Sequence, residues 1–169
     1  MLRRSFFALP ALAFQPERIH TPYVETPPDV VDAMLDLAGV HARDLVYDLG
    51  SGDGRVVIAA AKRFCAKAVG IENHLERVRQ ARENARLAGV ANLVRFVHDD
   101  FFAADLSEAT VVFLYLLPEV NLELRPKLWR ELKPGSRVVS HEFGMGDWKP
   151  QRTIEVRGAK VHKWLIPPT

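Results

Sequence analysis

The chain has 169 residues, 48% of them hydrophobic and 26% charged, with a formal net charge of +2 at pH 7. That length suits a single domain with a sizeable core, and so small a basic excess argues against a nucleic-acid-binding protein, which usually carries a concentrated Lys/Arg footprint. A single cysteine excludes a disulfide within the chain, the six scattered histidines show no metal-ligand spacing, and no stretch is long enough to cross a bilayer as a helix.

Residues 1–19 resemble a leader more than a part of the fold. Met1 to Phe14 combines two arginines with a short apolar run and an Ala-Leu-Ala triplet, as a secretory signal does, and Arg3 to Phe7 has a twin-arginine appearance. Against export, Pro10 breaks the apolar run, so a disordered leader or an amphipathic one bound to a membrane surface is an equal alternative. We therefore expect the domain to occupy residues 20–169, with both interpretations of the leader open.

A helix is predicted to begin after an extended lead-in at residues 20–26. Thr26-Pro27-Pro28-Asp29 places a threonine at the N-cap, a proline at the first helical position and an acid in the first turn. Apolar residues at helical spacing continue to Ala38, and Gly39 ends the helix.

The strongest pattern is Leu45 to Ala61, LVYDLGSGDGRVVIAAA. An apolar run ends in Asp48, the glycine-rich turn of residues 50–54 follows, and an apolar helical pattern starts directly after it. At such a strand–turn–helix junction, backbone N–H groups converge and bind ligands, and glycines at alternate positions let a ligand approach the backbone.

The charges of this turn indicate the kind of ligand. A dinucleotide fingerprint needs its third glycine at position 55, which is an arginine, and no Lys-Ser/Thr pair follows to make a phosphate loop. Asp48 and Asp53 would repel a pyrophosphate, so a ligand with a cationic end fits better.

Lys67 to Glu72 is the second predicted strand, after a helix over Val56 to Phe64. Its terminal Glu72 is placed to accept hydrogen bonds from both hydroxyls of a ribose. An NAD-binding fold would also have an acid there, so Glu72 supports a nucleoside ligand without choosing the cofactor. Cys65, in the helix after the glycine turn, is expected to be a buried structural thiol.

Strands and helices continue to alternate until two strands form a hairpin. A helix covers Leu75 to Ala88, and Pro126 bends or breaks the next helical segment, which begins at Pro118. The remaining predicted strands are Leu93 to Val97, Thr110 to Leu117, Ser136 to Phe143, Thr153 to Arg157 and Val161 to Ile166. This order predicts an α/β fold with a doubly wound, mostly parallel sheet and an antiparallel C-terminal hairpin.

The glycine turn and its surroundings resemble motif I of the class I S-adenosylmethionine (SAM)-dependent methyltransferases. SAM carries an ammonium, a sulfonium and a single carboxylate, which suits a turn flanked by Asp48 and Asp53. The resemblance extends over Tyr23 to Ile166, apart from the link Gly144 to Arg152, which is too short for the helix that many members carry there. It implies the fold predicted above and SAM as the cofactor.

The resemblance also implies which residues contact SAM. After the third strand of this fold, an acid commonly accepts a hydrogen bond from the adenine amino group. Asp100 takes that place, with Asp99 as the alternative, and an acidic turn that caps the next segment is the competing interpretation. The expected cofactor-binding set is Tyr23, Thr26, Asp48, Gly50, Ser51, Gly52, Asp53, Glu72, Asn73, Asp99, Asp100 and Phe101.

Short flanking motifs resemble one branch of these enzymes. Pro22-Tyr23-Val24-x-Thr26-Pro27, the stretch DLGSGDGRVVIAAAKRF and the region of Trp148 are similar to the protein-lysine N-methyltransferases that act on the ATP-synthase c subunit and the adenine nucleotide translocase, and to their bacterial relatives. Members of this branch often have a membrane-associating N-terminus. The resemblance therefore implies methylation of a protein lysine, with membrane proteins among the acceptors, in the cytoplasm or at the cytoplasmic face of a membrane. A small-molecule methyltransferase and a non-catalytic SAM-binding module are the alternatives.

Candidate residues for the methyl acceptor lie where strands end, since an α/β sheet keeps its site there. Tyr115, Glu119 and His141 are placed to orient or deprotonate an amine. The competing structural explanation is wall packing for Tyr115, a helix-dipole partner for Glu119 and a hydrogen-bonded core histidine for His141. The fourth strand ends in Tyr-Leu-Leu-Pro instead of the Asn/Asp-Pro-Pro of enzymes that methylate planar amines, which argues against a DNA base as substrate. We expect an acceptor protein or a small molecule, with no nucleic-acid partner and no metal.

Overall fold

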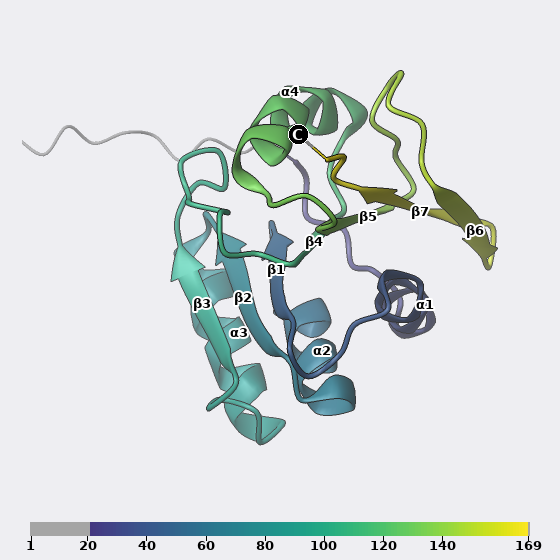
Figure 1. Ribbon diagram of the computed structural model, residues 1–169. Coiled ribbons are helices and arrows are strands. Elements are labelled where there is room, and N and C mark those ends of the chain that lie inside the picture. The colour runs from purple at the N-terminus through teal and green to yellow at the C-terminus, as the bar shows by residue number, and fades with distance from the viewer. Residues whose placement is uncertain (1–20, 169) are drawn as a thin grey trace, which may run out of the picture.

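The computed structural model describes residues 21–168, and the predicted leader at residues 1–19 lies outside them. In the described range, seven strands form one sheet and four helices pack against it (Figure 1). The elements in chain order are α1 (Pro28–Ala38), β1 (Leu45–Leu49), α2 (Arg55–Phe64), β2 (Lys67–Glu72), α3 (Leu75–Leu87), β3 (Val94–His98), β4 (Val111–Leu114), α4 (Pro118–Glu131), β5 (Arg137–His141), β6 (Arg152–Val156) and β7 (Ala159–Leu165).

The strands follow the order β3-β2-β1-β4-β5-β7-β6. The first five strands are parallel, whereas β7 runs antiparallel to both β5 and β6. This confirms the doubly wound, mostly parallel sheet and the antiparallel hairpin predicted from the sequence. The strand order reverses between β1 and β4, and sheets of this kind bind ligands at the carboxyl ends of the strands beside such a reversal.

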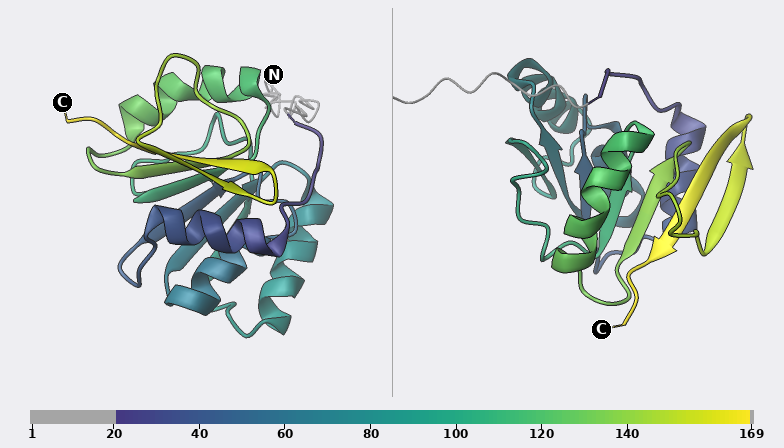
Figure 2. Two further views of the ribbon diagram at one scale, coloured as in Figure 1. Left: turned by 90° about the vertical axis from the view of Figure 1, so that its right-hand side faces the viewer. Right: turned by 90° about the horizontal axis from the view of Figure 1, so that it is seen from above.

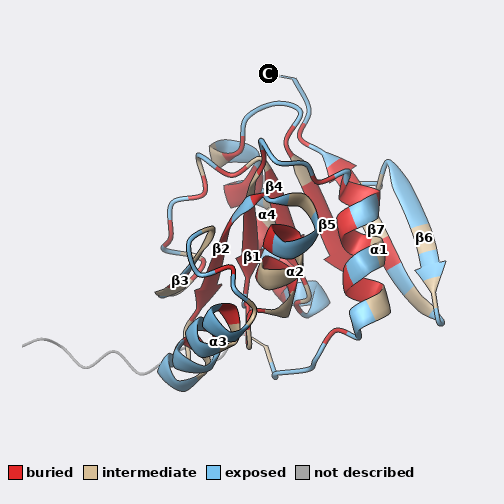
Figure 3. Ribbon diagram, turned by 90° about the horizontal axis from the view of Figure 1, so that it is seen from below, coloured by how far each residue is buried: buried red, intermediate tan, exposed pale blue. Residues whose placement is uncertain are grey.

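Helices α1, α2 and α3 cover one face of the sheet, and α4 lies on the other (Figure 2). Because successive side chains of a strand point to opposite faces, Val46 packs in the core beneath α1 to α3 and Tyr47 in the core beneath α4. All four residues of β4 are buried, which explains their continuous apolar run. Figure 3 shows the same burial along the central strands and the inner sides of the helices.

The predicted N-cap of the first helix is wrong by one residue. Pro27 is the N-cap and α1 begins at Pro28. Thr26 Oγ1 instead forms a hydrogen bond with Nδ1 of His141, at 3.2 Å, so its hydroxyl does not cap the helix. The segment that enters α1 is thereby joined to the end of β5.

Two further local predictions need correction. Cys65 is exposed, because it caps the C-terminal end of α2 at the surface with a left-handed backbone. Of the bend or break predicted at Pro126, the break is wrong, because helix α4 continues through the proline. Leu124 and Leu128 on either side of this exposed proline are fully buried, and their packing holds the helix together despite the missing N–H donor.

The link between β5 and β6 contains no helix, as its length predicts. It is fixed through its backbone carbonyl groups: Trp164 Nε1 donates to Trp148 O at 2.8 Å, and Arg125 Nη1 donates to Met145 O at 2.9 Å. None of the helices within residues 21–168 combines the length and the apolar character that a membrane span requires.

Candidate functional site

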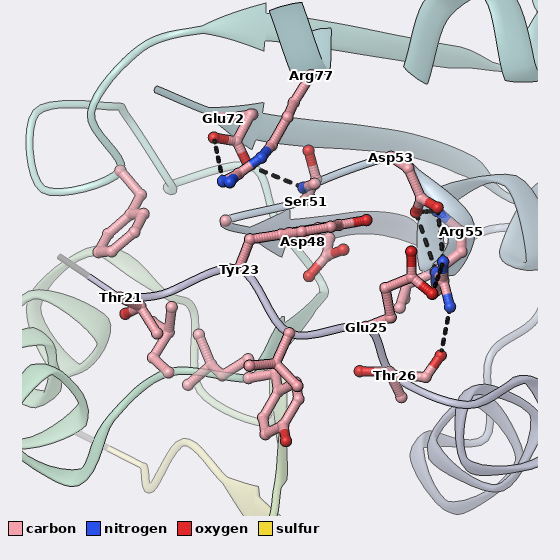
Figure 4. A pocket seen from close by; sticks show the side chains of 18 of the residues that line it. Thr21, Tyr23, Glu25, Thr26, Asp48, Ser51, Asp53, Arg55, Glu72 and Arg77 are labelled. Carbon is pink, nitrogen blue, oxygen red and sulfur yellow. Dashed lines mark hydrogen bonds and ion pairs between the residues drawn. The ribbon is translucent and has the colours of Figure 1, made fainter. Parts of the chain in front are cut away.

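A pocket opens at the carboxyl ends of β1 and β4, where the strand order reverses (Figure 4). The space between its walls, including space open to solvent, is about 710 Å³. The residues predicted from the sequence that line it are Tyr23, Thr26, Asp48, Gly50, Ser51, Gly52, Asp53, Glu72, Asn73, Phe101 and Tyr115. Among residues 21–168, no group of His, Cys, Asp and Glu side chains is arranged to hold a metal ion.

The glycine turn is held against β2 by backbone hydrogen bonds. The N–H groups of Gly50 and Ser51 both donate to Ile71 O, at 2.8 and 3.1 Å. Gly52 has a φ of 54° and lies so close to the ring of Tyr23 that a Cβ added at this position would be 2.5 Å from Cε2 of that ring. Only glycine therefore fits here without displacing Tyr23.

Glu72, at the end of β2, is 4% exposed, and the backbone orients its carboxylate. Gly52 N donates to Oε2 and His74 N donates to Oε1, each at 2.9 Å. Arg77 Nη1 lies 3.9 Å from Oε1. Each carboxylate oxygen has a second lone pair, so Glu72 can accept further hydrogen bonds from ribose hydroxyls while its position stays fixed.

Asp48 is a buried acid in the wall of the same pocket. Burial raises the pKa of Asp48 to about 7, and the negative charges of Glu72 and Asp53 act in the same direction. A cation beside this carboxyl would stabilise its charged form, whereas an anion would not. The pocket therefore fits a ligand with a positively charged group, as the ammonium and sulfonium of SAM require.

One wall of the pocket is the segment of residues 21–26, which we call the strap (Figure 4). The ring of Tyr23 lies between the glycine turn and the guanidinium of Arg77, whose Cζ is 4.3 Å from the ring centroid. Arg55 Nη1 donates to Thr26 O at 2.9 Å, and Arg55 also pairs with Asp53 of the turn. The strap is thus attached directly to the turn that it faces.

Sequence reasoning missed the contribution of Arg55 and Arg77 to this site. In the sequence, Arg55 stands out only because it replaces a glycine of the dinucleotide fingerprint, and Arg77 is one of several arginines on a charged helix. An arginine two residues after Asp53, at the first position of a helix, is the one local signal that Asp53 has a protein partner. The contact between Arg77 and Tyr23 has no local signal at all.

Asp99 and Asp100 do not line the pocket. Asp99 Oδ1 accepts from Asp100 N at 2.8 Å, and Asp100 Oδ1 accepts from Phe102 N at 2.9 Å, the pattern of an acidic turn that caps its own backbone. Phe101, which follows Asp100, is the residue of this turn that reaches the pocket.

Two of the three predicted catalytic residues also lie outside the pocket lining. Glu119 is exposed in the first turn of α4. His141 is 4% exposed, and its ring centroid lies 3.9 Å from that of Tyr115, which does line the pocket. Burial lowers the pKa of His141 although the charge of Glu142 acts to raise it, so the histidine is neutral at pH 7 and bonded to Thr26.

Comparison with known proteins gives a consistent family. The family model described as the ANTKMT methyltransferase domain matches residues 48–152. A protein-lysine N-methyltransferase of Saccharolobus islandicus is 51% identical over 144 residues, which cover 85% of this chain and 89% of that protein. The adenine nucleotide translocase lysine N-methyltransferase of Mus musculus is 36% identical over 82% of this chain. The Homo sapiens lysine N-methyltransferase named for the ATP-synthase c subunit is 33% identical over 85%. The chain spans 60% and 59% of the lengths of these two mammalian proteins.

Solved structures agree with this fold. A Salinibacter ruber protein described as an RNA methyltransferase, crystallised with S-adenosyl-L-homocysteine (SAH), is 56% identical and superposes with a TM-score of 0.85 over 86% of this chain and 95% of its own. TrmN from Thermus thermophilus superposes with a TM-score of 0.69 over 83% of this chain and 49% of its own, but at 20% identity it supports the fold alone.

Proposed function

Because the chain belongs to the ANTKMT methyltransferase domain family of SAM-dependent methyltransferases, we propose that it transfers a methyl group from SAM to the ε-amine of a lysine side chain in an acceptor protein. The observation that carries this proposal is the 51% identity to the Saccharolobus islandicus protein-lysine N-methyltransferase over 89% of that protein. The two mammalian relatives, which are also lysine N-methyltransferases by name, support the same chemistry.

The cofactor is SAM, and the pocket residues suit it. Bound SAM supplies a methyl group attached to a positively charged sulfur. Asp48 provides the buried carboxyl that favours a cationic ligand, and Glu72 provides two fixed oxygens for ribose hydroxyls. Phe101 provides an apolar surface for the adenine ring, and the glycine turn exposes backbone to the ligand.

On the acceptor side, we assign direct contact with the lysine to Tyr115. It follows β4 and lines the pocket, with its ring 3.9 Å from that of His141 and stacked 6.5 Å from that of Phe143. An aromatic surface of this kind packs along the methylene chain of a lysine. Apolar surroundings also lower the pKa of the amine, which favours the neutral, nucleophilic form.

The contribution of the protein is then orientation and exclusion of water. Tyr115 holds the acceptor chain, the strap and the glycine turn enclose the cofactor, and no protein nucleophile is needed. His141 takes part indirectly, because its hydrogen bond to Thr26 fixes the strap next to Tyr115.

RNA methylation is the second candidate, since it is the description of the Salinibacter protein. The end of β4 favours the lysine proposal: Tyr115-Leu116-Leu117-Pro118 lacks the side-chain amide or carboxylate that commonly binds a planar amino group. The nearly balanced charge of the chain supports the same choice, because RNA-binding surfaces are usually strongly basic.

The test is to incubate the purified chain with methyl-labelled SAM and four fractions of a lysate: soluble protein, membranes, purified RNA and a small-molecule filtrate. We expect label in a protein band that survives ribonuclease and is lost to protease, with methyl-lysine identified by peptide mass. Labelling in the soluble or the membrane fraction separates soluble from membrane acceptors. We propose that either kind is met in the cytoplasm or at the cytoplasmic face of a membrane.

The remaining outcomes identify the alternatives. Ribonuclease-sensitive label would assign the chain to RNA, and label in small molecules alone would assign it to metabolites. SAM binding with no label in any fraction would identify a SAM-binding module. The domain at residues 20–169, prepared without the leader, should show the same labelling if the leader serves only to bring the enzyme to its acceptor.

A further inference from the structure

The strap crosses from the end of β5 to the glycine turn and forms the wall of the pocket opposite that turn (Figure 4). A ligand between the two would contact the strap on one side and the turn on the other. The contacts that hold the strap down therefore bear on how fast the cofactor and its product exchange.

Arg55 makes two of these contacts and also pairs with the turn. Its Nε and Nη2 atoms donate to the two oxygens of Asp53, at 3.0 and 2.7 Å, in a bidentate pair. Nη1 donates to Thr26 O at 2.9 Å, and Nη2 also lies 3.1 Å from Oε2 of Glu25. One guanidinium thus joins two residues of the strap to the carboxylate of the turn, an arrangement that the planar fork of arginine allows and the single ammonium of lysine does not.

The ion pair between Arg55 and Asp53 is partly buried. The side chain of Arg55 is 28% exposed and that of Asp53 16%, so solvent screens the pair less than it screens a surface ion pair. Burial acts to raise the pKa of Asp53, but the hydrogen bonds and charge of Arg55 outweigh it and hold that pKa below its ordinary value. Asp53 is therefore charged at neutral pH and bonded to Arg55 through both of its carboxylate oxygens.

We propose that Arg55 is a positioning residue that fastens the strap over the pocket and thereby limits the rate at which SAH leaves and SAM enters. The inference rests on SAM-dependent transfer by this site, but not on the identity of the acceptor. It also assigns Asp53 to the same fastening, instead of to direct contact with the cofactor.

The test uses the full chain and compares Arg55→Ala with Arg63→Ala. Arg63 lies on the same helix and makes two exposed ion pairs to α1, with Asp32 and Asp36, so the control removes the same charge and a similar number of contacts away from the pocket. The dissociation rate of SAH is measured by stopped-flow competition, and amide hydrogen exchange is followed over residues 21–26.

We expect Arg55→Ala to raise the SAH dissociation rate about tenfold and to speed exchange in the strap, because charge-assisted hydrogen bonds are lost. Arg55→Lys should restore part of the difference, and Arg63→Ala should match the unaltered chain in both measurements. If Arg55→Ala is poorly folded, Glu25→Ala removes only the more exposed contact and should still raise the rate measurably.

An SAH dissociation rate in folded Arg55→Ala within twofold of the unaltered chain would overturn the proposal, whatever the exchange data show. The readout needs no acceptor, so it is independent of the lysine assignment. Failure of the unaltered chain to bind SAH would instead contradict the proposed function itself.

Discussion

The ring of Tyr23 lies directly over Gly52, so close that a methyl group on the glycine would be 2.5 Å from Cε2 of the ring. The two residues belong to opposite walls of the pocket, and their contact sets the distance between the strap and the turn.

Gly52→Ala should weaken SAH binding at least tenfold, because the added methyl group pushes Tyr23 and the strap away from the turn. The matched control is Gly89→Ala: Gly89 also has a positive φ, 74° against 54°, but nothing lies within 4 Å of its added Cβ. Both substitutions should lower the free energy of unfolding by roughly 1–2 kcal/mol through backbone strain. Calorimetric titration with SAH would contradict the prediction if the two variants bound equally well.

Asp48 should make the stability of the empty enzyme fall as the pH rises from about 4 to 7. The folded chain retains the proton on Asp48 up to a pKa of about 7, whereas the unfolded chain loses it near pH 4. The free energy of unfolding is therefore highest below about pH 4. Above about pH 7 the buried charge of Asp48 lowers it by up to about 4 kcal/mol. Asp48→Asn should remove this slope and be more stable than the unaltered chain at pH 8. Urea unfolding at pH 5 and pH 8 measures both chains.

The same carboxyl should make SAM binding depend on pH. Because the positive charges of SAM favour ionised Asp48, the affinity of the unaltered chain for SAM should increase from pH 5.5 to 7. Asp48→Asn should bind SAM more weakly at pH 7 and lose most of this increase. Equal pH profiles of SAM affinity for the two chains would show that Asp48 does not sense the ligand charge.

Tyr115→Ala should lower kcat/KM for the protein acceptor by about 30-fold or more while leaving SAH affinity within about threefold. Tyr115→Phe should keep most of the activity, because we assign the contact to the ring, which packs beside His141 and Phe143. A loss in Tyr115→Phe as large as in Tyr115→Ala would instead give the hydroxyl group a catalytic role. Initial rates at saturating SAM distinguish the two.

Arg137 should stabilise the fold without affecting the pocket. It pairs with buried Asp44 and donates to Ala38 O and Gly39 O, each at 3.0 Å, at the end of the sheet away from the pocket. Arg137→Met should lower the free energy of unfolding by about 3 kcal/mol and leave SAH affinity unchanged. Arg130→Met, which removes an exposed ion pair, should change stability by less than about 1 kcal/mol.

The stabilisation that the Arg137–Asp44 pair contributes should be lost at low pH. Burial acts to raise the pKa of Asp44, but hydrogen bonds from Thr110 and His41 N and the charge of Arg137 hold it below its ordinary value. The stabilisation is therefore present above about pH 4 and is lost as the pH falls through the lowered pKa. In Arg137→Met the loss should begin at a higher pH, which acid titration followed by circular dichroism can detect.

The parts of the fold that follow from local patterns were predictable from the sequence. The strand, turn and helix of Leu45 to Ala61 combine a buried apolar run, glycines at positive φ and a helical period, and all three signals agree. The short link after β5 also excluded a helix by length alone. Glu72 was predictable because the end of β2 must lie beside the turn that follows β1.

Contacts between distant segments were not predictable in this way. Thr26 and His141 are 115 residues apart, and only the path of the strap brings them together. The local interpretation of Thr26 as a helix cap is therefore wrong. His141, a candidate base by its position in the sequence, already has its Nδ1 atom bonded to Thr26. Arg55 shows both cases: its pair with Asp53 is local, but its bond to Thr26 spans 29 residues.

The exposed position of Cys65 has a practical consequence. It is the single cysteine of the chain, and it ends the ten-residue helix whose first residue is Arg55. A maleimide fluorophore can therefore be attached at one known point, about 15 Å along the helix from the fastening of the strap, without removing any native thiol. A second label in the strap would then report each opening of the pocket as a change in energy transfer during single turnovers.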